Sequence, residues 1–95
     1  MSRITELVLT KDYKRDIKKL TAELLSGGEY NEVMYCLHNG ITLPEQYKDH
    51  ALQSNWKGYR DCHVKNNLVL IYKVEETTLY LLRLAPHSDL FKKNK

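Results

Sequence analysis

Three of the four histidines follow one another through the second half of the chain, at His50, His63 and His87. Imidazole titrates near neutral pH, so a histidine can remove a proton or deliver one. With Arg83 to stabilise developing negative charge, these side chains suit the cleavage of an RNA phosphodiester without a metal ion. One group would take the proton of the 2′-hydroxyl and another would protonate the departing 5′-oxygen. The residue types do not decide which histidine does which.

Two other interpretations of these histidines stay open. Each histidine taken alone is typical of a scattered surface residue. Zinc binding through His50, Asp61, His63 and His87 is a further interpretation, although no two of them have the i, i+4 spacing of a helical ligand pair. No metal or other cofactor is therefore expected.

Basic and aromatic residues around the histidines predict contacts with single-stranded RNA. Lysine and arginine hold backbone phosphates, and aromatic rings stack on bases. Trp56 is equally well explained as a core anchor, and Phe91 as a residue that fixes the C-terminal tail. The net charge of +3 suits an anionic partner without identifying one. The candidate contacts are Lys48, Trp56, Lys57, Arg60 and Phe91.

The elements that must position these residues follow from hydrophobic periodicity. Thr10 is a suitable N-cap, and after it Tyr13, Ile17, Leu20 and Leu24 form one helical stripe. Later segments are rich in β-branched, aromatic and leucine residues and are separated by tight turns, as in a meander of antiparallel strands. The predicted elements, in chain order, are a strand at 3–9, helices forming a hairpin at 11–25 and 29–39, a loop at 41–55, and strands at 56–64, 68–74 and 78–84.

Strand periodicity assigns faces to the candidate residues. Alternate residues of a strand point to the same side, so Asp61 and His63 are predicted to share one face. By the same spacing Arg83 is predicted to share a face with Leu79 and Leu81. An acid and an imidazole would then lie together on the sheet, with the helices covering its other side.

Length and composition limit the class of protein. The 95 residues, 42% hydrophobic and 28% charged, fit one globular domain spanning 1–95. The sequence has no apolar run of about 18 residues and no secretory leader pattern, which predicts a cytoplasmic protein without a membrane partner. Its two cysteines, Cys36 and Cys62, form no CxxC pair and are expected to be buried or half-buried thiols.

Four segments, in this order and spacing, resemble the YafQ-like toxins of the RelE/ParE superfamily. The resemblance implies an α+β, microbial-ribonuclease-like RelE fold, β-α-α-β-β-β, with an antiparallel sheet packed on the two-helix hairpin. The segments are Leu43-Pro-Glu-Gln-Tyr-Lys-Asp-His-Ala-Leu, Asn55-Trp-Lys-Gly-Tyr-Arg-Asp-Cys-His-Val, Leu70-Ile-Tyr-Lys and His87-Ser-Asp-Leu-Phe.

The resemblance also implies a function. Such proteins are the toxins of type II toxin-antitoxin systems, and they are ribosome-dependent endoribonucleases that cleave messenger RNA in the ribosomal A site. The implied partners are a cognate antitoxin, the ribosome with its mRNA, and operator DNA only through the antitoxin complex. By position, the resemblance implies His50 and His87 as general acid and base, Asp61 and His63 as active-site partners, Arg83 as phosphate stabiliser and Phe91 as a substrate contact.

Two positions depart from the family pattern. Asn67 stands in the turn after the His63 strand, where the family commonly has an acidic residue. Pro86 makes the segment before His87 stiffer than the small-residue segment usual there. These departures allow a catalytically weak member that only binds its antitoxin or RNA. A nucleic-acid-binding module without enzymatic activity is the third hypothesis.

Overall fold

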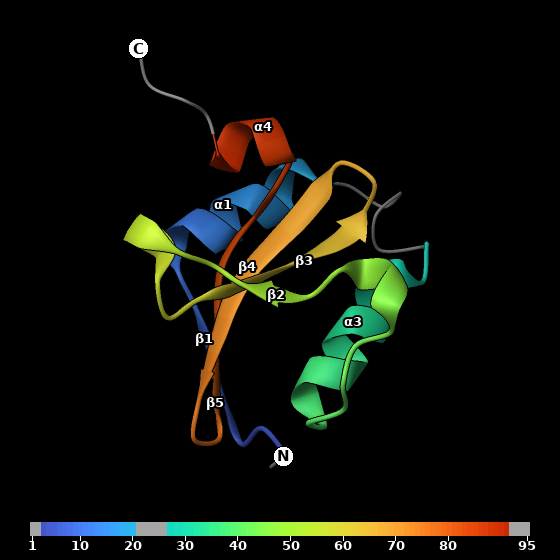
Figure 1. Cartoon of the computed structure of the whole chain (residues 1–95), viewed down its shortest axis with the longest axis vertical. Helices are drawn as coiled ribbons and strands as arrows, with labels where there is room; N and C mark the ends of the chain where they lie inside the picture. The colour runs from blue at the N-terminus through green and yellow to red at the C-terminus, as the bar shows by residue number, and fades with distance from the viewer. Residues whose placement is uncertain (1–2, 21–26, 92–95) are drawn as a thin grey trace.

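A five-stranded mixed sheet with helices packed against it makes up the computed structural model, which describes residues 3–20 and 27–91 (Figure 1). The strand order is β1-β5-β4-β3-β2, with β1 parallel to β5 and the other neighbours antiparallel. The elements are β1 (Glu6–Leu9), α1 (Lys11–Lys19), α3 (Glu29–His38), η1 (Glu45–Tyr47), β2 (His50–Ala51), η2 (Ser54–Trp56), β3 (Arg60–Lys65), β4 (Leu68–Glu75), β5 (Thr78–Ala85) and α4 (His87–Leu90).

Thr10 makes the turn from β1 into α1, as predicted. Its hydroxyl accepts a hydrogen bond from the Tyr13 N–H at 3.0 Å and donates one to the Leu82 carbonyl at 2.7 Å. The predicted end of this helix is wrong. The helix stops at Lys19. The Leu20 N–H donates to the Ile17 carbonyl, which tightens the last turn, and the backbone of Leu20 is extended. The remainder of the predicted helix falls on residues 21–25, outside the described part.

The second predicted helix is confirmed as α3. It begins after Gly28, whose φ of 89° lies in the left-handed region that favours glycine. Val33, Cys36 and Leu37 belong to the same buried cluster as Tyr13 of α1, so both helices contribute to the core on one side of the sheet. The hydroxyls of Tyr13 and Tyr30 join the two helices at 2.5 Å.

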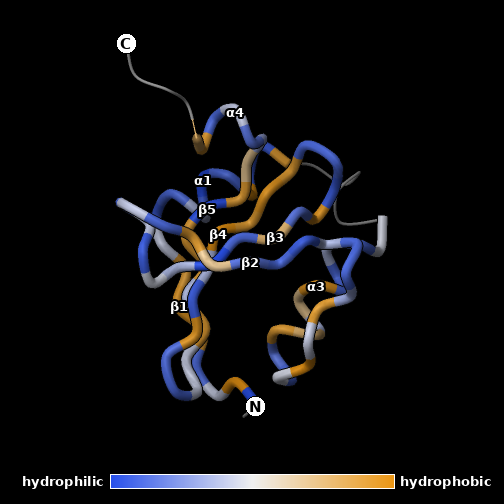
Figure 2. The backbone as a smooth tube through the Cα atoms, viewed as in Figure 1, coloured by the Kyte–Doolittle hydropathy of each residue, from blue (hydrophilic) through white to orange (hydrophobic). Residues whose placement is uncertain are grey.

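The central strand of the sheet is β4, as its continuous apolar run predicts. Leu70 and Tyr72 point into the helix-side core, whereas Val69 and Ile71 point to the opposite face. All four are buried, so β4 carries an apolar surface on both sides. Figure 2 shows this hydrophobic stretch along β4 between more hydrophilic edges. The expectation for Cys62 is also confirmed, because it is a buried free thiol in the helix-side core.

A β-bulge in β5 corrects the predicted face of Arg83. Leu81 pairs with Tyr72 and Arg83 pairs with Ile71, which leaves Leu82 as an extra residue between them. An extra residue shifts the alternation by one position. Arg83 therefore lies on the face of Ile71, opposite the helix-side core that contains Leu81.

The loop predicted at 41–55 is partly wrong, because it contains the short edge strand β2. Trp56 was predicted to open the next strand, but it lies in the 3-10 turn η2, and β3 begins only at Arg60. Arg60 pairs with Ala51 of β2, which makes a hairpin closed by the intervening turn. Among the helices of residues 3–20 and 27–91, none has the length and apolar character needed to span a bilayer.

Candidate active site

A single row of paired residues crosses four strands on the face opposite the helix-side core. His50 of β2 pairs with Asp61 of β3, Asp61 with Ile71 of β4, and Ile71 with Arg83 of β5. Directly paired residues of antiparallel strands project to the same side of a sheet. The pairing therefore aligns an imidazole, a carboxylate, an apolar floor residue and a guanidinium across the sheet.

A second row lies one step along the strands and completes the cluster. His63 pairs with Val69, and Val69 pairs with Ala85. Two residues after Ala85 the chain reaches His87, the first residue of α4. The predicted convergence of His50, His63 and His87 is therefore a consequence of strand pairing and of the turn at the end of β5.

The orientation of the His50 ring follows from its hydrogen bond. Its Nδ1 atom lies 2.8 Å from the backbone carbonyl of Lys48. A carbonyl oxygen can only accept, so Nδ1 must carry the hydrogen and neutral His50 has its lone pair on Nε2. Lys48 adopts a left-handed conformation with φ of 52°, which turns this carbonyl at the end of η1. Because 53% of the His50 side chain is exposed, a substrate can reach the ring.

Asp61 is a buried carboxylate among three imidazoles. Only 2% of the residue is exposed, and one of its oxygens lies 3.2 Å from His50 Nδ1. That oxygen accepts no hydrogen bond from any described residue, since the Nδ1 hydrogen points to the Lys48 carbonyl. Burial raises the pKa of Asp61, whereas the charges of His50, His63 and His87 act to lower it. Asp61 can thus stabilise a proton on the neighbouring imidazoles.

His87 has two other rings near it. Its ring centroid is 4.7 Å from that of Phe91 and 6.2 Å from that of His63. Pro86 precedes it, and the Pro86 carbonyl accepts hydrogen bonds from the Asp89 and Leu90 N–H groups. The stiff residue thus closes the first turn of α4 and places His87 over the end of β5, while Phe91 packs against its ring.

A recess of about 370 Å³ opens beside His63 and is lined by residues from α3, η1 and β3. Lys48, Lys65 and Gln46 lie in its wall together with Glu29. Lys65 Nζ is 3.9 Å from a Glu29 oxygen, whereas Lys48 forms no ion pair within the described part of the chain. Lys48 is therefore the cation of this recess that is best placed to meet a phosphate.

Comparison with known proteins identifies the family. A family model for bacterial toxins of type II toxin-antitoxin systems, YafQ, matches residues 5–92. The chain belongs to the YafQ toxin family.

Individual relatives agree with this assignment. A protein of Haemophilus influenzae named as a YafQ toxin is 50% identical over 78 residues, which are 78% of this chain and 76% of its own. The mRNA interferase toxin YafQ of Escherichia coli K12 is 39% identical over 80 residues, 83% of this chain and 87% of its own. A chain from the crystal structure of the E. coli DinJ-YafQ toxin-antitoxin complex superposes with a TM-score of 0.80 at 35% identity, covering 96% of this chain and 99% of that one. The RelE fold expected from the resemblance is confirmed.

Three of the predicted RNA contacts of this YafQ-family chain lie away from the histidine cluster. Arg60 projects to the helix side, where its guanidinium pairs with Asp49 at 3.0 Å. The Tyr72 hydroxyl donates to the same carboxylate, so these groups form a polar network of their own. Trp56 and Lys57 lie in the β2–β3 turn, beyond the Arg60 end of the hairpin, whereas His63 lies toward its other end. The Trp56 ring packs edge-on against Tyr59.

The sequence interpretation missed two carboxylates that bind candidate residues. Asp16 binds Arg83, and Asp49 ties the segment before His50 to β3 and β4. Asp16 does carry a signal in the sequence, since it lies next to the apolar stripe of Tyr13 and Ile17, where a carboxylate is unusual.

The zinc interpretation finds no ligand set in the described part of this toxin. No three histidine, cysteine, aspartate or glutamate side chains of residues 3–20 and 27–91 are arranged to hold a metal ion. Asn67, the first departure from the family pattern, is exposed in the turn between β3 and β4.

Proposed function

We propose that this toxin is a ribosome-dependent messenger RNA endonuclease that cleaves by acid-base catalysis with histidines. The observation that carries the proposal is the placement of His50 and His87 around Asp61, on one face of the sheet. The name mRNA interferase that its E. coli relative bears supports it. A toxin that cleaves messages on ribosomes would act in the cytoplasm, where messages are translated.

In the proposed reaction His50 is the general base. Its Nε2 lone pair takes the proton of the RNA 2′-hydroxyl, and the freed oxygen attacks the adjacent phosphorus. The imidazolium that forms lies 3.2 Å from the Asp61 carboxylate, which stabilises the new positive charge. The Lys48 carbonyl keeps the ring in the correct tautomer throughout.

His87 is then the general acid. It delivers a proton to the departing 5′-oxygen, so that one RNA product ends in a 2′,3′-cyclic phosphate and the other begins with a 5′-hydroxyl. Phe91 packs against the His87 ring, and His63 lies near it. Arg83, at the end of the row, stabilises the negative charge on the phosphorane, and Lys48 binds a neighbouring backbone phosphate. Asp61 and the three histidines are the proposed catalytic centre.

The proposal includes partners. A cognate antitoxin would bind this toxin, as DinJ and YafQ form a toxin-antitoxin complex in E. coli. The antitoxin would hold this toxin inactive and would carry the resulting complex to operator DNA. The ribosome would present the messenger RNA in the A site. The net charge of +3 favours association with both RNA-containing partners.

Mapping of RNA ends tests the proposal. Bacterial cells would express the toxin together with a reporter message and with a copy of that message lacking its start codon. We expect growth arrest and new 5′ ends in phase with the codons of the translated reporter, and no cuts in the untranslated copy. Cuts in both copies would contradict ribosome dependence. A folded, abundant toxin that causes neither arrest nor cuts would contradict the nuclease and leave a binding protein.

A further inference from the structure

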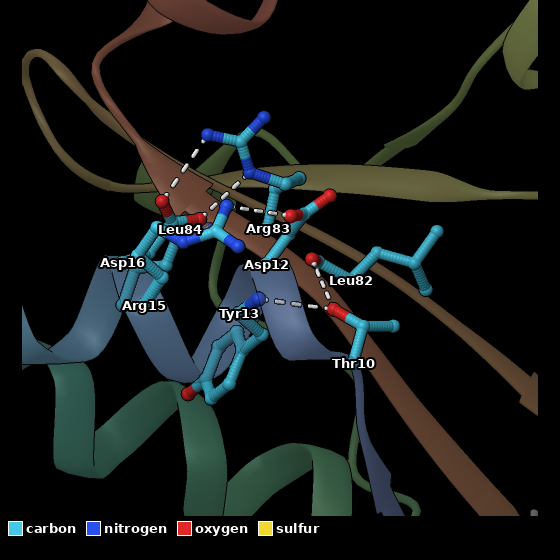
Figure 3. A network of polar contacts seen from close by, with 8 residues as sticks. All are labelled: Thr10, Asp12, Tyr13, Arg15, Asp16, Leu82, Arg83 and Leu84. Atoms are coloured by element: carbon cyan, nitrogen blue, oxygen red, sulfur yellow. Dashed lines mark hydrogen bonds and ion pairs between the residues drawn. The ribbon is translucent and has the colours of Figure 1, made fainter.

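Asp16 of α1 is a buried carboxylate that accepts hydrogen bonds from Arg83 and from the next residue, Leu84 (Figure 3). One oxygen accepts a hydrogen bond from Arg83 Nε at 2.8 Å, and the other accepts one from Nη2 at 3.1 Å. The first oxygen also accepts the backbone N–H of Leu84 at 2.9 Å. Only 5% of Asp16 is exposed, so all three bonds are made with little competition from water.

The topology explains why a helix supplies this carboxylate. Pairing of β1 with β5 ends at Leu81, and the chain then turns at Thr10 into α1. Beyond this point the outer edge of β5 has no neighbouring strand among the described residues. The Leu84 N–H would lack a partner there, and Asp16 supplies one. The bulge at Leu82 brings Arg83 to the same place.

We propose that Asp16 is a positioning residue for RNA cleavage, which fixes one edge of the Arg83 guanidinium so that its other edge faces the scissile phosphate. The inference rests on the proposed nuclease function. A guanidinium has five N–H donors, and Asp16 uses the two on the Nε and Nη2 side. Among residues 3–20 and 27–91, no partner bonds to the two donors of Nη1 or to the second donor of Nη2, so the end-on fork that binds phosphate oxygens is available there.

The geometry assigns different roles to the two contacts of Asp16. The bond to Leu84 N–H needs only an acceptor, and an amide oxygen serves for that. The fork to Arg83 needs two acceptor oxygens and a negative charge. Asp16→Asn therefore retains the strand-edge contact and loses the paired grip on Arg83. The freed guanidinium would rotate, and a displacement of about 1 Å at a catalytic group costs up to about 100-fold in rate.

The test is a double-mutant cycle on full-length toxin, using ribosomes programmed with a defined message. We expect Asp16→Asn to lower kcat about 10- to 100-fold with little change in KM, because the lost interaction acts on the transition state. Arg83→Ala should lower kcat at least as much. The double variant should be no slower than Arg83→Ala alone, since Asp16 acts only through Arg83.

The matched control is Asp12→Asn on the same helix. Asp12 binds Arg15 at 2.9 Å on the surface, so this variant removes the same charge without touching the Arg83 fork, and it should cleave at the wild-type rate. Asp16→Asn cleaving at the wild-type rate, or losses that multiply in the double variant, would overturn the proposal. If Asp16→Asn fails to fold, Arg83→Lys takes its place: one ammonium cannot replace the fork, and wild-type activity would overturn the proposal. Failure of the wild type itself to cleave would instead refute the proposed function, and this inference with it.

Discussion

Replacing His50 with alanine is expected to slow cleavage of ribosome-bound messenger RNA about 100- to 10,000-fold, the usual contribution of a general acid-base group. The change removes the Nε2 atom that receives the 2′-hydroxyl proton. His87→Ala should produce a loss of similar size, because protonation of the leaving 5′-oxygen is an equal part of the reaction. Single-turnover rates with purified toxin and programmed ribosomes measure both losses directly.

Two further variants make the His50 result specific. His50→Asn keeps an amide N–H near the position of Nδ1, so it can still bond to the Lys48 carbonyl, but it has no titratable nitrogen. It should be as inactive as His50→Ala. His38→Ala serves as control, since His38 lies on α3, its backbone carbonyl accepts the Ile4 N–H, and its side chain has no polar partner among the described residues. An active His50→Asn variant, or equal losses from His38→Ala, would exclude His50 as the base.

Asp61→Asn is expected to stabilise the folded protein at neutral pH by about 1 kcal/mol while slowing cleavage about 100-fold. The charged form of a buried carboxylate is the costly one, and burial raises the pKa of Asp61. The activity falls because the imidazolium formed on His50 loses its neighbouring charge. If Asp61 lowers stability but raises activity, its replacement should raise the free energy of unfolding and lower the cleavage rate.

The pH dependence of stability distinguishes this cause from a change in packing. A raised pKa in the folded state gives stability that is fully present below the unfolded value of about 4 and is lost as the pH rises through the folded value. The wild type should therefore match the Asp61→Asn variant in acid and become less stable than it toward neutrality. Urea unfolding at a series of pH values measures this difference. A constant difference across the series would contradict the assigned cause.

Much of the histidine cluster could be predicted because strand periodicity places residues on faces. Asp61 and His63 are two apart in one predicted strand, so their common face follows from alternation alone. The apolar run of β4 also predicted its central place. Periodicity does not determine how the segments that carry His50 and His87 pair with the other strands. The resemblance to the toxin family associated these two histidines with the same site.

The parts that could not be predicted depend on tertiary contacts. The bulge at Leu82 reverses the face of Arg83, and no residue near it signals a change of alternation. The strand β2 has only two residues, too few for a pattern, and it exists because it pairs with β3. Arg60 was assigned to RNA by its charge, whereas Asp49, distant by eleven positions, binds it on the other side of the sheet.

The chemistry of the RNA ends tests the central claim most directly. A reporter message cleaved by the wild-type toxin on ribosomes would be probed for its new termini, using a kinase that requires a 5′-hydroxyl and a phosphatase that opens cyclic phosphates. Attack by the 2′-hydroxyl with histidine acid-base catalysis predicts 2′,3′-cyclic phosphate on one fragment and 5′-hydroxyl on the other. Fragments that begin with a 5′-phosphate and end in a free 3′-hydroxyl would show attack by water instead, and would contradict the roles proposed for His50 and His87.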